Sequence, residues 1–388
     1  MKTKTYISAC ALAMALAFAS FAQAADNNSA VVTQAGNTNT ATVTQSGNNN
    51  TVDPFDQSGS GNTATITQSG TGNSAGANVA SVLNPGGRMG ITQTGIGGTM
   101  VLTQSGDSNE AAIVQSGTSA QVTVIQAGNA NYADASQTAK RNDIINITQS
   151  LGSSNNKAIS WQNGHDQESI ITQNGDNSVV QNYQYSQIND FIEVTQTGSF
   201  NNSLTRQYGG AAWAQVTQDG LTLSSTILQN RGTNRVTVDQ LGDTNTSNVT
   251  QDTGDIATVD QSGNNNGSSI VQATNDSADV TQSGSYSTGT VLQNGSGEIA
   301  ILNQSGSYSS ANLTQGGLGD WTDVTQSGDF GDVKLNQSGV GNNQATVVQS
   351  GIGTALARNL VDITQAGDSN IASVTQSGGA GNSVTINQ

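Results

Sequence analysis

The sequence predicts an all-β protein, a two-sheet β-solenoid of about 16 coils, and three observations lead to this fold class. Glutamine returns about every 11 residues from Gln34 to Gln388. Apolar and polar residues alternate before most of these glutamines, and a period of two is the period of a β-strand. Gly, Asn and Ser cluster after each strand pattern and favour a turn. A short period sustained along the chain is typical of stacked repeats.

The composition supports stacked repeats over ordinary globular domains. Apolar residues make up 33%, charged residues 10% and aromatic residues 4% of 388 residues. That is too little apolar material for a conventional core and too little charge for a charge-driven disordered chain. A strictly periodic chain rich in Asn and Gln favours cross-β stacking, in which side-chain amides form ladders.

The first residues predict a cleaved secretory signal peptide at 1–24. Lys2 and Lys4 precede an apolar run, Ile7 to Phe18, that is too short to span a bilayer, and Ala22-Gln23-Ala24 offers a cleavage site. We therefore expect export through the periplasm, with residues 25–388 forming a single β-solenoid domain. No later segment is long and apolar enough for a membrane helix.

The charge excludes one class of partner. Removing Lys2 and Lys4 from 11 basic and 27 acidic residues leaves 9 and 27, a net charge of −18. Such a surface repels nucleic acid and anionic membranes, so we expect no nucleic-acid binding.

The repeating unit is shown by the stretch from Asn39 to Gly47. In a strand, Ala41, Val43 and Gln45 point to one face and the intervening threonines to the other. Ser46 and Gly47 follow as a turn, in which Gly can take a positive φ. Two such 11-residue units make one 22-residue coil, and stacked coils pair their backbones and align their amides. The residues expected to form these self-assembly ladders are Gln34, Asn39, Gln45, Asn50, Gln57, Asn62, Gln68, Gln104, Asn109, Gln126, Asn131, Gln365, Asn370, Gln376 and Gln388. The expected turn glycines are Gly36, Gly47, Gly70, Gly106, Gly128, Gly367 and Gly378.

Four interruptions of the pattern follow in chain order. Asp53 falls at an inward position next to Pro54, which predicts a bulge or a weak rung. The stretch 78–84 keeps the pattern with Asn84 in place of Gln and is followed by a Pro-Gly-Gly turn. In 174–195 the register stays open, because Gln181, Gln184 and Gln187 compete for the repeat position. The stretch 351–360 holds a five-residue insertion.

No residue pattern predicts catalysis, a cofactor or a metal. His165, the only histidine, follows Asn-Gly at a corner and suits a solvated turn. Cys10 lies in the expected signal peptide, so the mature chain has no thiol or disulfide chemistry. The aspartates that recur three residues after a Gln suit turns and disfavour lateral association: Asp107, Asp176, Asp243, Asp329 and Asp368.

The ends of the repeat array predict growth. The first repeat begins soon after the expected cleavage site, and the strand pattern 382–388 runs to the final residue. Neither end shows a helix or a charged cap of the kind that closes soluble solenoids. Two open, complementary edges favour end-to-end addition of subunits.

These residues resemble the curlin repeat, Ser-x5-Gln-x-Gly-x2-Asn-x5-Gln. The stretches Gln34 to Gln45 and Gln126 to Gln137 match from the first Gln to the last. The resemblance implies a secreted functional amyloid, exported through an outer-membrane secretion pore and assembled with a nucleator or a major curli subunit into adhesive biofilm fibres. The chain has more repeats than is usual for curli subunits and lacks the Gly-rich N-terminal segment of the major one, so major subunit and nucleator both stay open.

The expected function is therefore a non-enzymatic, extracellular fibre subunit on the cell surface, which assembles with copies of itself. The alternative is a monomeric solenoid that binds ice, polysaccharide or a host ligand. Flat Thr-x-Thr arrays would favour ice binding, but full pairs directly before a Gln occur only at Thr42/Thr44 and Thr65/Thr67. The uncapped ends favour the fibre subunit.

Overall fold

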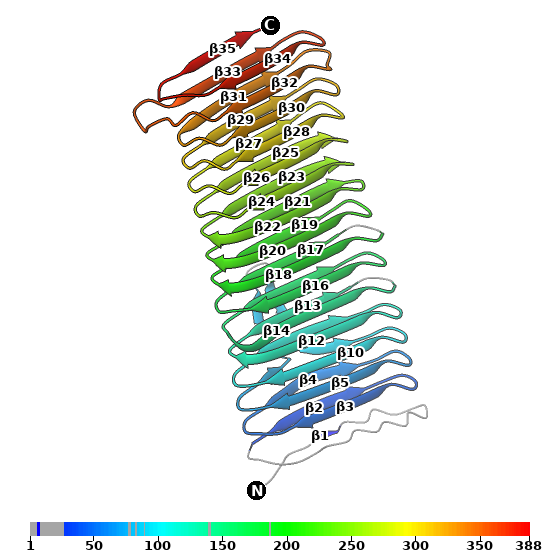
Figure 1. Ribbon diagram of the computed structural model, residues 1–388. Helices are drawn as coiled ribbons and strands as arrows, with labels where there is room; N and C mark the ends of the chain where they lie inside the picture. Colours follow the sequence, from blue (N-terminus) through cyan, green and yellow to red (C-terminus); the bar gives the residue numbers. More distant parts are fainter. Residues whose placement is uncertain are drawn as a thin grey trace. The chain divides into compact units, whose positions relative to one another are not determined.

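The computed structural model describes residues 6–7, 27–76, 79–81, 84–88, 90–138, 141–185 and 188–388. The expected signal peptide, apart from the two-residue strand β1 (Tyr6–Ile7), lies outside these ranges. The described residues contain strands and no helix, and so no helix capable of crossing a membrane. Figure 1 shows the strands of successive coils side by side.

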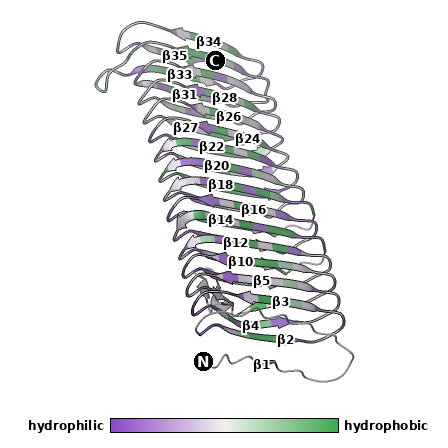
Figure 2. Cartoon of the chain, turned by 60° about the horizontal axis from the view of Figure 1, so that its bottom comes forward, coloured by the Kyte–Doolittle hydropathy of each residue, from purple (hydrophilic) through white to green (hydrophobic). Residues whose placement is uncertain are grey.

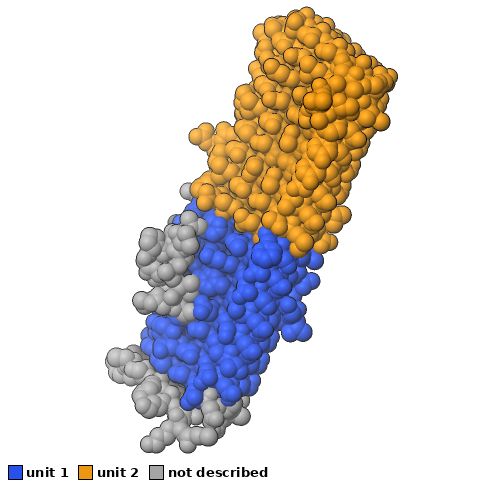
Figure 3. All heavy atoms as spheres, turned by 90° about the vertical axis from the view of Figure 1, so that its left-hand side faces the viewer, with its two compact units in different colours: residues 1–200 blue, residues 201–388 orange. Residues whose placement is uncertain are grey.

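The chain divides into two compact units, residues 1–200 and 201–388 (Figure 3). Each unit contains two parallel sheets, and the chain alternates between them strand by strand. In unit 1, one sheet contains β2 (Ser29–Gln34), β4 (Thr51–Gln57), β6 (Ser74–Ala75), β9 (Ile91–Gln93), β11 (Glu110–Gln115), β13 (Tyr132–Gln137), β15 (Lys157–Gln162) and β17 (Val179–Gln184). The other contains β3 (Thr40–Gln45), β5 (Thr63–Ser69), β10 (Thr99–Ser105), β12 (Gln121–Asn129), β14 (Ile144–Ser154), β16 (Glu168–Asn174) and β18 (Phe191–Ser199).

Unit 2 repeats this arrangement. One sheet contains β19 (Asn202–Gln207), β21 (Ser224–Arg231), β23 (Thr246–Thr253), β25 (Gly267–Thr274), β27 (Thr288–Gln293), β29 (Ser310–Gln315), β31 (Gly331–Gln337), β33 (Asn359–Gln365) and β35 (Ser383–Asn387). The other contains β20 (Trp213–Leu221), β22 (Arg235–Asp243), β24 (Ile256–Gln261), β26 (Ser277–Gln282), β28 (Ile299–Gln304), β30 (Trp321–Gln326), β32 (Gln344–Gln349) and β34 (Ile371–Gln376).

Each strand buries one face, as the alternation predicts. In β26 the side chains of Ala278, Val280 and Gln282 are buried, while Asp279 and Thr281 point outward. A small, a branched and an amide side chain recur inward in this way in most strands, and these rows from the two sheets form the core. Figure 2 shows the apolar residues concentrated along the strands. The prediction of an all-β, two-sheet β-solenoid of about 16 coils is confirmed.

Successive strands of a sheet pair in a register that stacks like on like. β10 pairs with β12 so that Gln104 lies opposite Gln126 and Leu102 opposite Val124. The same register aligns Gln282 with Gln304 in unit 2. A slip of one residue would turn the apolar row outward, so burial of that row keeps the register.

The stretch with the open register has its repeat position at Gln184. β17 pairs with β15 so that Gln184 lies opposite Gln162, and the Gln184 side chain is 1% exposed. Gln181 also lies on β17, opposite Ile159 of β15, and the Gln181 side chain is half-buried. Gln187 lies outside the described residues.

The prediction that Asn84 takes a repeat position is wrong. The strands β7 (Val79–Ser81) and β8 (Asn84–Arg88) form an antiparallel hairpin. This hairpin is inserted into a single rung, whose two halves are β6 and β9, both paired with β11. Gln93 closes that rung opposite Gln115. The described residues of this stretch, 79–81 and Asn84, therefore belong to a local hairpin, whose strands have the same period of two as a coil strand.

Asp53 does not occupy the inward position either. The register between β2 and β4 shifts after Ala30, so that Val52 lies opposite Ala30 and Phe55 opposite Val32. The predicted bulge is present, and it turns Asp53 to the exposed side while Val52 and Phe55 stay buried. A buried unpaired carboxylate would be costly, and one extra residue in the strand avoids it.

Candidate functional site: the stacked amide ladders

Buried glutamines form hydrogen-bonded ladders in both sheets of each unit. Gln45 Nε2 donates to Gln68 Oε1 at 2.8 Å, and Gln68 Nε2 donates in turn to Gln104 Oε1 at 2.8 Å. The steps from Gln34 to Gln184 and from Gln45 to Gln196 all have this direction: the amide nitrogen of one coil donates to the amide oxygen of the next. In unit 1 the ladders contain Gln34, Gln57, Gln93, Gln115, Gln137, Gln162 and Gln184, and Gln45, Gln68, Gln104, Gln126, Gln149, Gln173 and Gln196.

Unit 2 contains two ladders with the same polarity. They run through Gln207, Gln229, Gln251, Gln272, Gln293, Gln315, Gln337, Gln365 and Gln388, and through Gln218, Gln240, Gln261, Gln282, Gln304, Gln326, Gln349 and Gln376. Each ladder therefore has a donor end and an acceptor end, like the backbone of a parallel sheet.

The same amide groups also tie the two sheets of a coil together. Gln293 Nε2 donates both to Gln315 Oε1 and to the backbone carbonyl of Ser277, each at 3.0 Å. Ser277 begins β26, in the opposite sheet. Because Gln293 is fully buried, both hydrogen bonds form away from water, where an amide group without a hydrogen-bond partner is costly. A glutamine at this position thus stabilises the coil and its contact with the next one.

Asparagines make a second kind of ladder at the corners. Asn50 Oδ1 accepts the backbone N–H of Asn73 at 3.0 Å, and Asn50 Nδ2 donates to the carbonyl of Gly70 at 3.0 Å. Asn73 repeats this with Asn109, and Asn109 with Asn131. The corner asparagine therefore joins its own turn to the next turn by both its donor and its acceptor.

The structure places all of the expected ladder residues in these columns. Gln57, Asn62, Gln68, Gln104, Asn109, Gln126, Asn131 and Gln365 are at most 1% exposed. At the ladder ends the side chains are more open: Asn39 is 6% and Gln376 5% exposed, Gln34, Gln45 and Asn370 are half-buried, and Gln388 is exposed.

Five of the seven expected turn glycines lie where the backbones of neighbouring coils approach closely. A Cβ on Gly106 would fall on the carbonyl oxygen of Gly128, and one on Gly47 would fall on that of Gly70. Gly36, Gly70 and Gly128 have equivalent contacts, and all five have a positive φ. Gly367 and Gly378 have no such backbone contact, since a Cβ there would meet only the amides of Asn370 and Asn382. The close approach, in addition to φ, requires glycine at the first five.

Glycine substitutions can separate the effect of the close contact between coils from the effect of a positive φ. Gly106→Ala is expected to destabilise unit 1 by about 2–4 kcal/mol, because it adds a clash between coils to the strain of a positive φ. Gly152→Ala is the matched control, since Gly152 has φ 85 against 92 for Gly106 and nothing within 4 Å of its Cβ position. Gly152→Ala should destabilise unit 1 by only about 1–2 kcal/mol. Equal shifts of the denaturation midpoint would contradict the role of coil contact.

A run of buried acids in unit 2 was missed in the sequence. Asp255, Asp276, Glu298 and Asp320 occupy the corner position of asparagine in four successive coils, and each is at most 1% exposed. Asp276 N–H donates to Asp255 Oδ1 at 3.0 Å, and Glu298 N–H to Asp276 Oδ1 at 2.9 Å. The spacing of four or five residues after a repeat Gln is visible in the sequence. Because asparagines at this position are expected to form ladders, the equivalence of the four acids with them is the signal that could have found this column.

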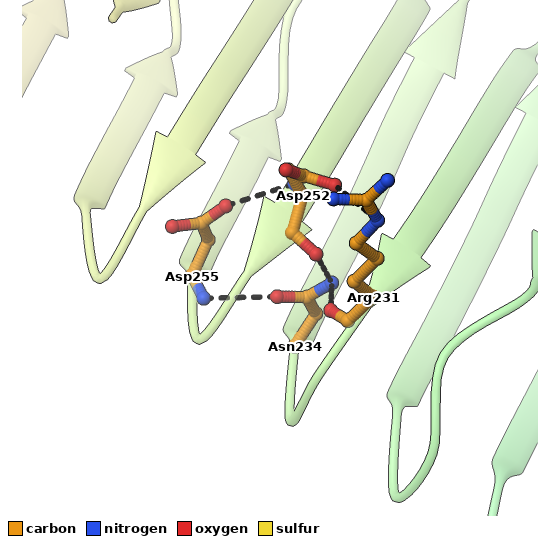
Figure 4. Close-up of polar contacts among 4 residues, drawn as sticks. All are labelled: Arg231, Asn234, Asp252 and Asp255. Carbon is orange, nitrogen blue, oxygen red and sulfur yellow. Dashed lines mark hydrogen bonds and ion pairs between the residues drawn. The ribbon is translucent and has the colours of Figure 1, made fainter. Parts of the chain in front are cut away.

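Figure 4 shows the start of this acidic column, where Asp255 follows Asn234 of the preceding coil. Asn234 Oδ1 accepts the N–H of Asp255 at 3.0 Å, while Asn234 Nδ2 donates to the carbonyls of Arg231 and Asp252. Asp255 Oδ2 accepts the N–H of Asp252 at 3.0 Å. Arg231 makes a long ion pair of 3.9 Å with the Asp252 side chain. The aspartate keeps the acceptor role of asparagine but lacks its N–H donor.

Burial raises the pKa of three carboxyl groups in this column, those of Asp255, Asp276 and Glu298. Burial, with smaller contributions from the charges of Asp276 and Asp320, raises the pKa of Glu298 to about 7. Burial likewise raises the pKa of Asp255 and of Asp276. Glu298 Oε1 has no hydrogen-bond partner among the described residues. A proton on any of these three carboxyl groups therefore stabilises the folded state.

The aspartates expected in turns do lie there, and they also join coils. Each accepts a backbone N–H from the preceding coil, at 2.7–3.2 Å: Asp107 from Thr71, Asp176 from Ser154, Asp243 from Leu221, Asp329 from Ser307 and Asp368 from Val340. Their effect on lateral association stays a prediction.

The described residues include no group of acids, histidines or cysteines placed to hold a metal. His165 lies at a corner, where its backbone bridges to Arg141. The geometry of this site is one of side-chain hydrogen bonds repeated from coil to coil.

Comparison with known proteins agrees with this geometry. The family model described as "Curlin associated repeat" matches residues 22–53, 99–128 and 357–388. These segments contain the strand pairs β2–β3, β10–β11 and β33–β34, with their ladder glutamines. A comparison with curated proteins finds no match. With matches in both units, the chain contains curlin-type repeats at three places.

Proposed function

We propose that the chain is a secreted curli-type fibre subunit, which adds end to end to copies of itself and forms extracellular amyloid fibres. The observation that supports this most directly is the polarity of the glutamine ladders. Gln34 and Gln45 begin the ladders of unit 1 as donors, and Gln388 and Gln376 end those of unit 2 as acceptors. A second copy that stacks in the same register would continue each ladder. It would do so by the same hydrogen bond, from Gln Nε2 to Gln Oε1, that joins successive coils within one chain.

The edge strands supply the matching backbone surface. β34 pairs with β32 and β35 with β33, each along one edge. In a parallel sheet the other edge offers N–H and C=O groups to a new strand. The core rows near that edge keep the common pattern, with Ala372 and Val374 each 4% exposed. An incoming subunit would thus meet the same small, branched and amide rows as any inner coil.

At the other end, β1 pairs in parallel with β2. β1 lies within the expected signal peptide, 1–24. Cleavage of that segment would remove this pairing and leave the edge of β2 open to another subunit. We therefore expect the mature chain to assemble faster than a chain that keeps residues 1–24.

Adhesion, cell aggregation and a role in the biofilm matrix are part of this proposal, as are cell-surface location, export through an outer-membrane pore and partnership with a nucleator or a major curli subunit. They are supported by the curlin-type repeats that the chain contains. Its repeating β-solenoid architecture also supports a structural role.

The first test is thioflavin-T kinetics on the purified mature chain, with and without sonicated seeds of itself, followed by fibre diffraction. Seeds should abolish the lag, and the fibres should diffract near ~4.8 and ~10 Å. A monodisperse, folded monomer that never grows would contradict the proposal and favour the surface-binding alternative.

A second test uses the position of a glutamine in its ladder. Replacing Gln376 or Gln45, at the outermost rungs, should lengthen the lag more than replacing Gln229, which is buried between two rungs. The reason is that the outer amides would meet the incoming subunit, whereas Gln229 acts only within one chain. Equal lag times for the three variants would contradict growth at these rungs.

A further inference from the structure

Three aromatic side chains form a column on one corner of unit 2. Tyr286, Tyr308 and Phe330 occupy the same position in successive turns, after β26, β28 and β30. The rings of Tyr286 and Tyr308 lie 4.9 Å apart and are parallel within 1°. Those of Tyr308 and Phe330 lie 4.9 Å apart and are parallel within 4°. The ring spacing equals the strand spacing of a sheet.

The backbone holds this column in place. All three residues have φ of 55–59°, which is uncommon for bulky side chains. Their N–H groups donate to carbonyls of the preceding turn at 2.8–2.9 Å: Tyr286 to Asn264, Tyr308 to Ser285 and Phe330 to Ser307. Because these bonds repeat with the coil, the two phenol rings are neighbours whenever the unit is folded.

The column is open to solvent. Tyr286 is 51% and Tyr308 43% exposed, so a small oxidant or the haem edge of a peroxidase can reach both rings. Tyr183 and Tyr185 offer a contrast, because their parallel rings lie 6.2 Å apart and Tyr183 is 2% exposed. Tyr286 and Tyr308 thus combine close parallel rings with exposure of both members.

We propose that Tyr286 and Tyr308 are a site of oxidative cross-linking, at which a dityrosine bond joins two successive coils. Each phenol gives one electron and its O–H proton to the oxidant, and one hydrogen peroxide, reduced to two waters, serves both. The two phenoxyl radicals form a C–C bond between carbons ortho to the oxygens. The two ortho protons then move to the phenol oxygens, which restores both rings. The product has lost two hydrogen atoms in total.

The bond would close a covalent loop between coils. Residues 286 and 308 are 22 positions apart, one full coil. A cross-link of this kind lowers the entropy of the unfolded chain, as a disulfide does. The oxidised chain should therefore unfold at a higher denaturant concentration than the untreated chain.

The experiment treats the full mature chain, dilute and unassembled, with a haem peroxidase and hydrogen peroxide. Dityrosine fluorescence is followed, and linked peptides are mapped by mass spectrometry. We expect most of the dityrosine in one intrachain pair, Tyr286 with Tyr308. Tyr308→Phe keeps the stacked ring but should abolish that pair, while Tyr208→Phe, at a comparably exposed tyrosine (47%) outside the column, should leave it.

A variant that gains a product guards against loss of fold as an explanation. Phe330→Tyr extends the column with a third phenol at the same spacing, and should add a cross-link between residues 308 and 330. Dityrosine spread evenly over all tyrosines, or found only between chains, would overturn the proposal. So would a Phe330→Tyr chain that folds and gives no new product. None of these outcomes depends on fibre growth, so the proposal can fail while the proposed function stands.

Discussion

Replacing Gln293 with alanine is expected to destabilise unit 2 by roughly 2–4 kcal/mol. The change removes the donor to Gln315 Oε1 and to the Ser277 carbonyl, and the acceptor of Gln272 Nε2. It also leaves a cavity in a row that is otherwise closely packed. Since each coil of a repeat array is stabilised by its neighbours, the loss weakens the adjacent coils too.

Denaturant unfolding of the unassembled chain measures this effect. Thr290→Ala, on the exposed face of the same strand, is the matched control and should change stability by no more than about 0.5 kcal/mol. Comparable losses for the two variants would mean that strand propensity, and not the amide ladder, supplies the stability.

Replacing Glu298 with glutamine is expected to stabilise unit 2 above neutral pH. Because the folded pKa, about 7, lies above the ordinary value of 4.5, the folded state binds this proton more tightly than the unfolded state does. The proton on Glu298 stabilises the folded state fully below about pH 4.5, and this stabilisation is lost as the pH rises through about 7. The full difference corresponds to roughly 3 kcal/mol for this one group.

Unfolding measured from pH 4 to pH 9 would show this. The unmodified chain should lose stability as the pH rises, and the raised pKa values of Asp255 and Asp276 act in the same direction. Glu298→Gln should flatten the curve and raise stability most at the alkaline end. Asp323→Asn, on the outer face of β30, controls for the loss of one negative charge. A curve for Glu298→Gln with the same slope as the unmodified chain would contradict the argument.

The fold could be predicted in large part because its rules are local. Alternation of side chains along a strand follows from covalent geometry, so the inward row of Ala278, Val280 and Gln282 could be assigned from the sequence. The repeat spacing also placed the amide columns, since equal spacing brings equal residues to the same level. The ladder bonds, with their common direction, are a consequence of that stacking.

The errors arose where a local pattern fits two structures. The alternation before Asn84 suits a hairpin as well as a coil, and only the pairing of β6 and β9 with one neighbour shows which is present. Asp53 could be assigned inward by counting from Gln57, but the shift opposite Ala30 moved it out. In both cases the outcome depends on contacts with a strand more than 20 residues away.

The sequence by itself determined the all-β class, the 22-residue coil, the curlin-type repeat and the inward residues of the regular strands, because these depend on alternation along a strand and on a constant repeat spacing. Tertiary structure alone decided which glutamine closes β17, that Asp255 to Asp320 form a buried acidic column, and that Tyr286 and Tyr308 stack. These features depend on which residues lie at the same level in neighbouring coils. That is set by the lengths of the intervening turns and by the burial that selects one register, and neither acts within a single strand.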